Sequence, residues 1–123
     1  MTLDSGALIA YERGERRAGA LIDAERRRRR AVTVPTAVLT EVWRGGSRQH
    51  CLQRLLADCV IAPLDEPLAR AAGELLGRTG TDDPVDAIVA QSAARHGDVV
   101  LTSDPDDLQR LADDLGTIRV RGV

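Results

Sequence analysis

Four acidic residues hold positions in this sequence from which their carboxylates could act together. Asp4 and Asp104 each follow a short apolar run with the composition of a β-strand, and Glu41 and Asp86 lie in helical segments farther along the chain. In open α/β sheets, ligands collect beyond the carboxyl ends of the strands. If the sheet is parallel, we expect these four side chains to share one edge of it.

Carboxylates that converge repel one another and raise one another's pKa values unless a cation neutralises them. A site with only oxygen ligands suits a hard divalent cation such as Mg²⁺ or Mn²⁺. Such an ion lowers the pKa of bound water and stabilises charge on phosphoryl oxygens, so no side-chain nucleophile is required. The four acids therefore favour metal-assisted chemistry on a phosphate ester.

Two of these acids also have a structural interpretation at the start of a helix. Asp4 followed by Ser5 matches a helix N-cap, and Asp104 with Asp107 three residues later resembles a reciprocal cap. Each pair could therefore have a purely structural role, with no part in catalysis.

The other two acids differ in how well a structural role explains them. Asp86 comes three residues after the expected cap Asp83, where the positive end of a helix stabilises an anion. Glu41 falls in the last two turns of its expected helix, where the macrodipole disfavours an anion. The structural interpretation is weakest for Glu41.

The composition excludes several other chemistries. All 17 basic residues are arginine, so a P-loop, a Schiff-base enzyme and a receiver domain that uses a lysine are ruled out. Tyr11 and Trp43 are the only aromatic residues, which argues against a platform of stacked bases. His50 and His96 are the only histidines, and neither position favours a mechanism based on a histidine pair. Any nucleic acid must be held mainly by arginine.

The length and hydropathy indicate one soluble domain over residues 1–123, of which 43% are hydrophobic and 29% charged. No apolar run approaches the roughly 20 residues of a membrane helix, and no signal peptide is evident, so we expect a cytoplasmic protein without membrane contact. Cys51 and Cys59 lack metal-site spacing and are expected to pack in the core.

The net charge of −2 conceals an uneven distribution along the chain. Residues 1–60 hold eleven arginines and seven acids, whereas residues 61–123 hold six arginines and twelve acids. The run Arg26 to Arg30 is interpreted as a solvated helix end, with a phosphate or partner contact as the alternative.

Short apolar runs alternate with helical patterns along the whole chain. Strands are expected at 1–3, 31–34, 59–62, 99–101 and 118–120. Helices are expected at 5–12, 16–29, from Pro35 to Gly45-Gly46, and at 47–57, 65–77, 84–96 and 105–115. This alternation predicts an α/β fold with a parallel sheet covered by helices on both faces.

Four segments of the sequence resemble the motifs of a known family. They are Leu3-Asp4-Ser5-Gly6-Ala7-Leu8-Ile9-Ala10, Pro35-Thr36-Ala37-Val38-Leu39-Thr40-Glu41-Val42, Val85-Asp86-Ala87-Ile88-Val89-Ala90 and Leu101-Thr102-Ser103-Asp104-Pro105-Asp106-Asp107-Leu108. In this order and at these spacings they resemble the four motifs of a PIN domain, specifically of the VapC toxins of bacterial toxin–antitoxin pairs. The match covers nearly the whole chain.

The resemblance implies a three-layer α/β/α sandwich with a central, mainly parallel sheet of four to five strands, and a metal-dependent endoribonuclease activity. It assigns catalysis and Mg²⁺ or Mn²⁺ binding to Asp4, Glu41, Asp86 and Asp104, with support from Asp107, Ser5 and Ser103. The implied partners are an RNA substrate, a cognate VapB-type antitoxin and a second copy of the chain. Helices of the first half, up to Arg30, are expected to contribute to the antitoxin groove and the RNA surface.

One position departs from the family pattern, since Gly6 stands where members often carry a second hydroxyl. Two alternatives remain open: a non-catalytic binding module of the same fold, and a metal-dependent nuclease or phosphatase with a substrate other than RNA.

Overall fold

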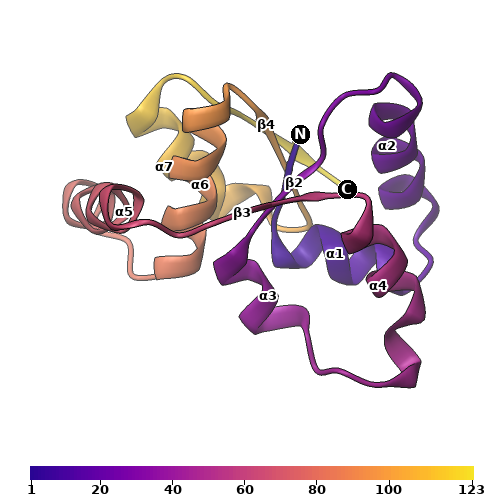
Figure 1. Ribbon diagram of the computed structural model, residues 1–123. Coiled ribbons are helices and arrows are strands. Elements are labelled where there is room, and N and C mark those ends of the chain that lie inside the picture. Colours follow the sequence, from indigo (N-terminus) through magenta and orange to yellow (C-terminus); the bar gives the residue numbers. More distant parts are fainter.

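The computed structural model describes residues 1–123 and contains one five-stranded sheet with helices on both sides (Figure 1). The strands are β1 (Thr2–Leu3), β2 (Thr33–Pro35), β3 (Val60–Ala62), β4 (Val99–Thr102) and β5 (Arg119–Gly122). The helices are α1 (Ser5–Glu12), α2 (Arg16–Arg27), α3 (Thr36–Val42), α4 (His50–Ala57), α5 (Glu66–Thr79), α6 (Pro84–His96) and α7 (Pro105–Leu115), with a short 3-10 helix η1 (Ser47–Gln49) before α4.

All strand pairs are parallel, and the strand order is β3-β2-β1-β4-β5. The chain proceeds from β1 outward to β3 and then crosses back through α5 and α6 to β4, so the order reverses between β1 and β4. Thr2 pairs with Val100 and Leu3 with Leu101, which places Asp4 opposite the end of β4. The predicted α/β fold with a parallel sheet is confirmed, and a crevice between β1 and β4 is where such sheets bind ligands.

Two helical layers enclose the core. Helices α1, α2 and α4 lie on one side of the sheet, and α5, α6 and α7 lie on the other (Figure 1). Strand residues Leu3, Val34 and Leu101 are fully buried between these layers. Helix α3 packs against both α1 and α6, so it lies at the carboxyl ends of the strands.

The local signals at both ends of α6 act as the sequence predicts. The Asp83 carboxylate accepts hydrogen bonds from the backbone N–H groups of Val85 at 2.9 Å and Asp86 at 3.2 Å. Pro84 opens the first turn, and Gly97 ends the helix with a φ of 66°, which glycine adopts without strain.

The region around α3 differs from the prediction. Pro35 is the last residue of β2, paired with Ala62, and does not begin the helix. The helix ends at Val42, before the two glycines, because the Gln49 side chain donates to the Val42 carbonyl at 2.8 Å and accepts from the N–H groups of Arg44 and Gly45. The expected helix 47–57 is accordingly split into η1 and α4.

The arginine run and one cysteine also depart from expectation. Arg26 binds Asp58 and Asp23, while Arg28 and Arg30 both lie near the Glu25 carboxylate, so the run is anchored within the chain in addition to being solvated. Cys51 is exposed rather than buried, because it lies on the outer face of α4. None of the helices combines the length and the apolar character that crossing a membrane requires.

Candidate active site

Asp4 is the acid at the centre of the carboxyl edge of the sheet. It directly follows β1 and is almost fully buried. Its carboxylate caps α1 by accepting from the backbone N–H of Ala7 at 2.8 Å, so the predicted N-cap is confirmed. Burial raises the pKa of Asp4, while hydrogen bonds from Thr102 and Ala7 oppose that rise. Asp4 therefore has a structural role as the cap of α1, beside the carboxyl end of β4.

The hydroxyl of Thr102 connects the first and fourth motifs, although the sequence reasoning did not single it out. Thr102 ends β4 and is fully buried. Its oxygen accepts the backbone N–H of Asp104 at 3.0 Å, and its hydroxyl lies close enough to the Asp4 carboxylate to lower the pKa of Asp4. A threonine two residues before an acid, at the end of a buried strand, is the signal that could have identified it.

Asp86 has the most perturbed carboxyl of the chain. It lies in the first turn of α6, and its pKa is raised from 3.8 to about 7. Burial is the largest cause, followed by the negative charges of Asp83, Asp4, Asp107 and Glu41. We call Asp86 and the four acids whose charges raise its pKa the acidic cluster.

The remaining predicted residues lie around the acidic cluster with different exposure. Glu41 is exposed near the end of α3, and its charge raises the pKa of both Asp4 and Asp86. Asp104 is exposed immediately before α7, and its side chain makes no capping hydrogen bond, so the predicted reciprocal cap is wrong. Asp107, one turn into α7, is the motif-four acid whose charge reaches Asp86.

A small cavity opens beside the acidic cluster, between α6 and α7. Its volume is about 250 Å³, and its lining includes Asp83, Asp86, Asp107 and Arg110. Arg110, which sequence reasoning did not consider, is the one basic side chain among the lining residues. The cavity therefore places a single cation next to several carboxylates.

The acidic cluster carries no internal neutralisation. Neither its five members nor Asp104 takes part in a salt bridge, a property they share with six acids elsewhere in the chain. No three Asp, Glu, His or Cys side chains are arranged to hold a metal ion in this structure. In donor chemistry, however, the cluster fits a hard cation, because its side chains offer carboxylate oxygens alone and none of them makes a salt bridge.

Gly6 is explained by its contact with Ser103. A Cβ at position 6 would lie 2.1 Å from the Ser103 Oγ and 3.0 Å from its Cβ. The Ser103 side chain thus occupies the space that a side chain at position 6 would need. The Ser103 hydroxyl therefore lies directly against Gly6, while Ser5 remains half-buried at the start of α1.

With this geometry in view, the comparisons with known proteins define the class of the chain. A family model for the PIN domain matches residues 1–114, so the chain belongs to the PIN domain family. PIN domains are generally metal-dependent nucleases, in agreement with an acidic cluster at the carboxyl edge of a parallel sheet.

Solved structures share the fold across nearly their whole length. VapBC2 from Rickettsia felis, bound to a DNA fragment from its promoter, matches with a TM-score of 0.78 and 13% identity, covering 99% of this chain and 97% of that one. FitAB bound to the IR36 DNA fragment gives a TM-score of 0.67 and 18% identity over 99% and 94% of the two chains. FitAcB from Neisseria gonorrhoeae gives a TM-score of 0.62 and 20% identity, covering 97% of this chain and 94% of that one. No curated protein matches the sequence.

Proposed function

We propose that this protein is a metal-dependent endoribonuclease and the toxin of a VapBC-type pair, formed by a single PIN domain over residues 1–123 and acting in the cytoplasm. The observation that carries the proposal is the unneutralised acidic cluster, in which the pKa of Asp86 is raised to about 7. Like charges this close are unfavourable for folding, and a divalent cation removes the cost.

The proposed roles follow from the position of each side chain. Asp4, Glu41, Asp86 and Asp104 would hold Mg²⁺ or Mn²⁺, and Asp107 would support them. When bound, the ion supplies an activated water and stabilises charge on the phosphoryl oxygens. The hydrogen bond from the backbone N–H of Ala7 holds the Asp4 carboxylate in one orientation, so that it need not reorganise during the reaction.

Two hydroxyls and one guanidinium complete the proposed site. Ser5 and Ser103 lie directly after Asp4 and directly before Asp104, where they can hydrogen-bond a phosphate oxygen or a metal-bound water. Arg110 faces the cavity between α6 and α7 and can pair with a phosphate of the RNA.

Cleavage of a mixed RNA pool by the antitoxin-free protein tests this proposal. We expect cleavage with Mg²⁺ or Mn²⁺, none with EDTA, and at least a hundredfold loss in Asp4→Asn, because one carboxylate ligand is removed. Asparagine also caps helices, so this variant should keep its fold. Asp106→Asn, which changes an exposed acid outside the acidic cluster, is the matched control.

Two results would redirect the assignment. A folded protein that cleaves nothing under any condition would favour the non-catalytic binding module. Equal cleavage of RNA and DNA versions of one oligonucleotide would refute the ribonuclease assignment and favour a nuclease without sugar preference.

An apolar surface supports the proposed protein partners, a VapB-type antitoxin and a second copy of the chain. The exposed large hydrophobic residues are Trp43, Val60, Ile61 and Leu64, which lie on or near α3 and the edge strand β3. Trp43 and Ile61 also line a cavity of about 590 Å³ with Leu39 and Leu56. Exposed apolar residues gathered around a cavity, as Trp43 and Ile61 are, mark protein–protein contacts. Size measurement with and without a co-expressed antitoxin would test both partners.

A further inference from the structure

A second cavity lies at the opposite end of the sheet from the acidic cluster, where the strands begin. Its volume is about 600 Å³, and four arginines line it together with Glu25 and Asp98. The arginines come from two distant parts of the chain: Arg28 and Arg30 follow α2, and Arg119 and Arg121 belong to β5. We call this the amino-edge cavity.

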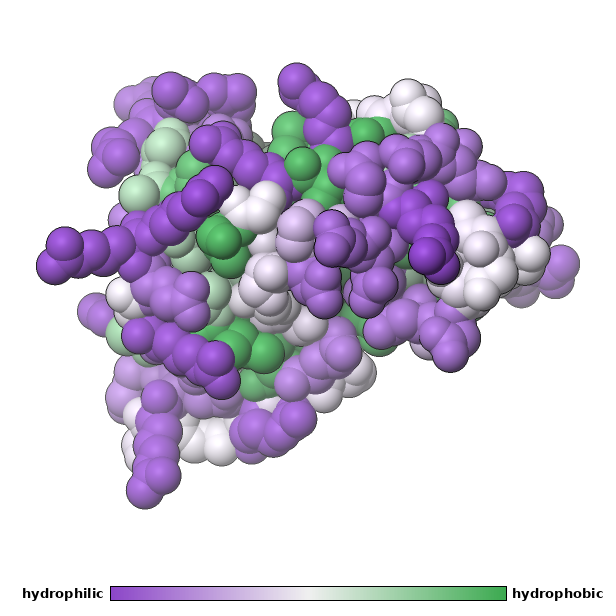
Figure 2. All heavy atoms as spheres, turned by 180° about the vertical axis from the view of Figure 1, so that it is seen from behind, coloured by the Kyte–Doolittle hydropathy of each residue, from purple (hydrophilic) through white to green (hydrophobic).

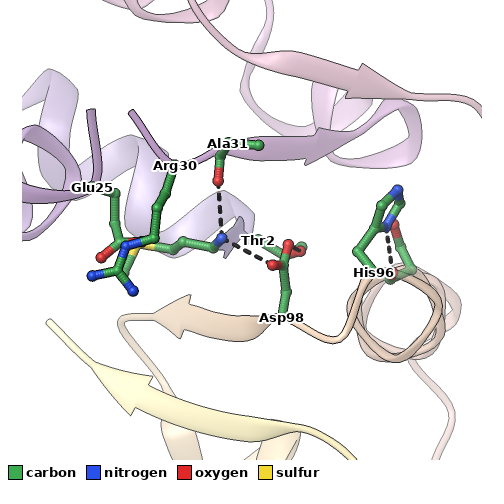
Figure 3. Close-up of polar contacts among 8 residues, drawn as sticks. Thr2, Glu25, Arg30, Ala31, His96 and Asp98 are labelled. Atoms are coloured by element: carbon green, nitrogen blue, oxygen red, sulfur yellow. Dashed lines mark hydrogen bonds and ion pairs between the residues drawn. The ribbon is translucent and has the colours of Figure 1, made fainter. Parts of the chain in front are cut away.

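Both acids of the amino-edge cavity are already engaged. The Glu25 carboxylate lies 3.8 Å from the Arg28 guanidinium and 3.6 Å from that of Arg30. Asp98 accepts a hydrogen bond from the Thr2 hydroxyl at 2.9 Å and lies 3.1 Å from the amino group of Met1 (Figure 3). Neither acid is left to neutralise the arginines of β5.

Arg119 and Arg121 have no partner within the protein. Neither side chain makes a hydrogen bond or a salt bridge, and both are exposed. Residues two apart in a strand point to the same side and lie about 7 Å apart. Val120, between them, is partly buried against the core, and all three residues line the amino-edge cavity, where both arginine side chains are exposed.

The surroundings favour a phosphate ligand over an apolar one. Four arginines face two engaged acids, and no aromatic side chain is present among the lining residues. Figure 2 shows the molecule from the side opposite to that of Figure 1, and hydrophilic side chains cover much of this surface. Guanidinium groups donate two parallel hydrogen bonds to phosphate oxygens, which no other side chain matches.

We propose that Arg119 and Arg121, with Arg28 and Arg30 beside them, form a binding site for the phosphodiester backbone of a nucleic acid strand, separate from the acidic cluster. This inference rests on the proposed nuclease function, because the strand bound here would be the flanking part of the substrate. With arginine as the only cation type and no aromatic platform, the site recognises phosphates and not bases.

The sheet register connects the two sites. Strand β5 is the neighbour of β4, with Arg119 beside Val99 and Arg121 beside Leu101. Asp104 follows the end of β4, so a backbone that runs along β5 from the amino-edge cavity reaches the carboxyl edge where cleavage is proposed. The four residues of β4 span only about 13 Å, a distance that a few nucleotides cover.

Nucleic-acid binding without cleavage tests the inference independently of catalysis. The affinity of a fluorescein-labelled single-stranded RNA of about twenty nucleotides is measured in EDTA by anisotropy, from about 50 to 200 mM NaCl, for the unmodified protein and Arg119→Gln/Arg121→Gln. We expect roughly tenfold weaker binding and a salt dependence that is shallower by about 1.4 in log–log slope, since two phosphate contacts are lost. Inorganic phosphate should compete with the RNA.

The matched control is Arg70→Gln/Arg78→Gln, which removes the same charge from α5, where both arginines pair with acids far from the cavity. This control should retain the affinity and the slope of the unmodified protein. Equal losses for RNA and for DNA of the same sequence support recognition of phosphates.

Several results would overturn the inference. A loss for RNA alone would assign recognition to the 2′-hydroxyl, and an equal loss in the α5 control would reduce the effect to net charge. Unchanged affinity together with new self-association would show that the β5 arginines only protect an edge strand. Cleavage of the same RNA by the unmodified protein with Mn²⁺ reports separately on the proposed function.

Discussion

Asp86→Asn should stabilise the protein when no divalent cation is present. The pKa of Asp86 is raised to about 7 from an ordinary value of 3.8, mainly by burial and then by four neighbouring acids. At about 1.4 kcal/mol per pH unit, this difference of about 3 corresponds to an upper limit near 4 kcal/mol. Because the side chain is only half-buried, solvent screening reduces that limit, and we expect about 2 kcal/mol.

The sign of the pH dependence follows from the raised pKa. Between about pH 4 and pH 7 the unfolded chain has lost this proton while the folded protein keeps it, so the stability of the unmodified protein falls as the pH rises. Asparagine carries no such proton. The variant should therefore match the unmodified protein near pH 4 and exceed it above pH 7.

Thermal unfolding in EDTA at pH 4.5 and pH 8 measures the effect. For a domain of this size, 2 kcal/mol corresponds to a rise in Tm of about 8 °C at pH 8, with little change at pH 4.5. Asp106→Asn, which removes an exposed charge at the start of α7, should not raise the Tm. Adding Mn²⁺ should stabilise the unmodified protein more than Asp86→Asn, because the variant lacks one ligand.

The reasoning would be refuted if Asp86→Asn lowered the Tm at pH 8, since that would make Asp86 a structural residue of α6. A gain of equal size at both pH values would also refute it, because the cause would then be packing and not charge.

Three further predictions follow from individual contacts. Gly6→Ala should destabilise the protein by about 1–2 kcal/mol, because a steric cost of about 1–3 kcal/mol exceeds the gain in helix propensity. In a double-mutant cycle measured by urea unfolding, Ser103→Gly should remove the part of that cost due to the serine side chain and leave the contact with the backbone nitrogen of residue 103. Additive effects would contradict the side-chain contact. Cys51 is exposed, whereas burial raises the pKa of Cys59 to about 11. A thiol reagent at pH 8 should therefore modify Cys51 quickly and Cys59 slowly, and Cys51→Ser should abolish the fast phase. Trp43 is the only tryptophan and is 39% exposed. Its fluorescence should therefore shift to shorter wavelength when a partner or a second copy binds the apolar surface. An unchanged spectrum upon association would place the interface elsewhere.

The sequence by itself determined the features that depend on nearby residues. The bounds of α1 and α6 were predicted correctly because their caps, Asp4 and Asp83, act on N–H groups two or three positions away. The alternation of strands and helices likewise determined a parallel sheet, whose geometry places acids after β1 and β4 at one edge. The position of these acids at that edge was therefore predictable without coordinates.

Only the tertiary structure decided which side chains meet across the fold. Thr102 joins Asp4 because β1 and β4 are neighbours in the sheet, although about a hundred residues separate them in sequence. The same strand order brings Ser103 against Gly6 and places the β5 arginines beside the end of α2. Local propensity and periodicity carry no information on such distant pairs, since these depend on the order in which strands associate and on how the helices pack over them.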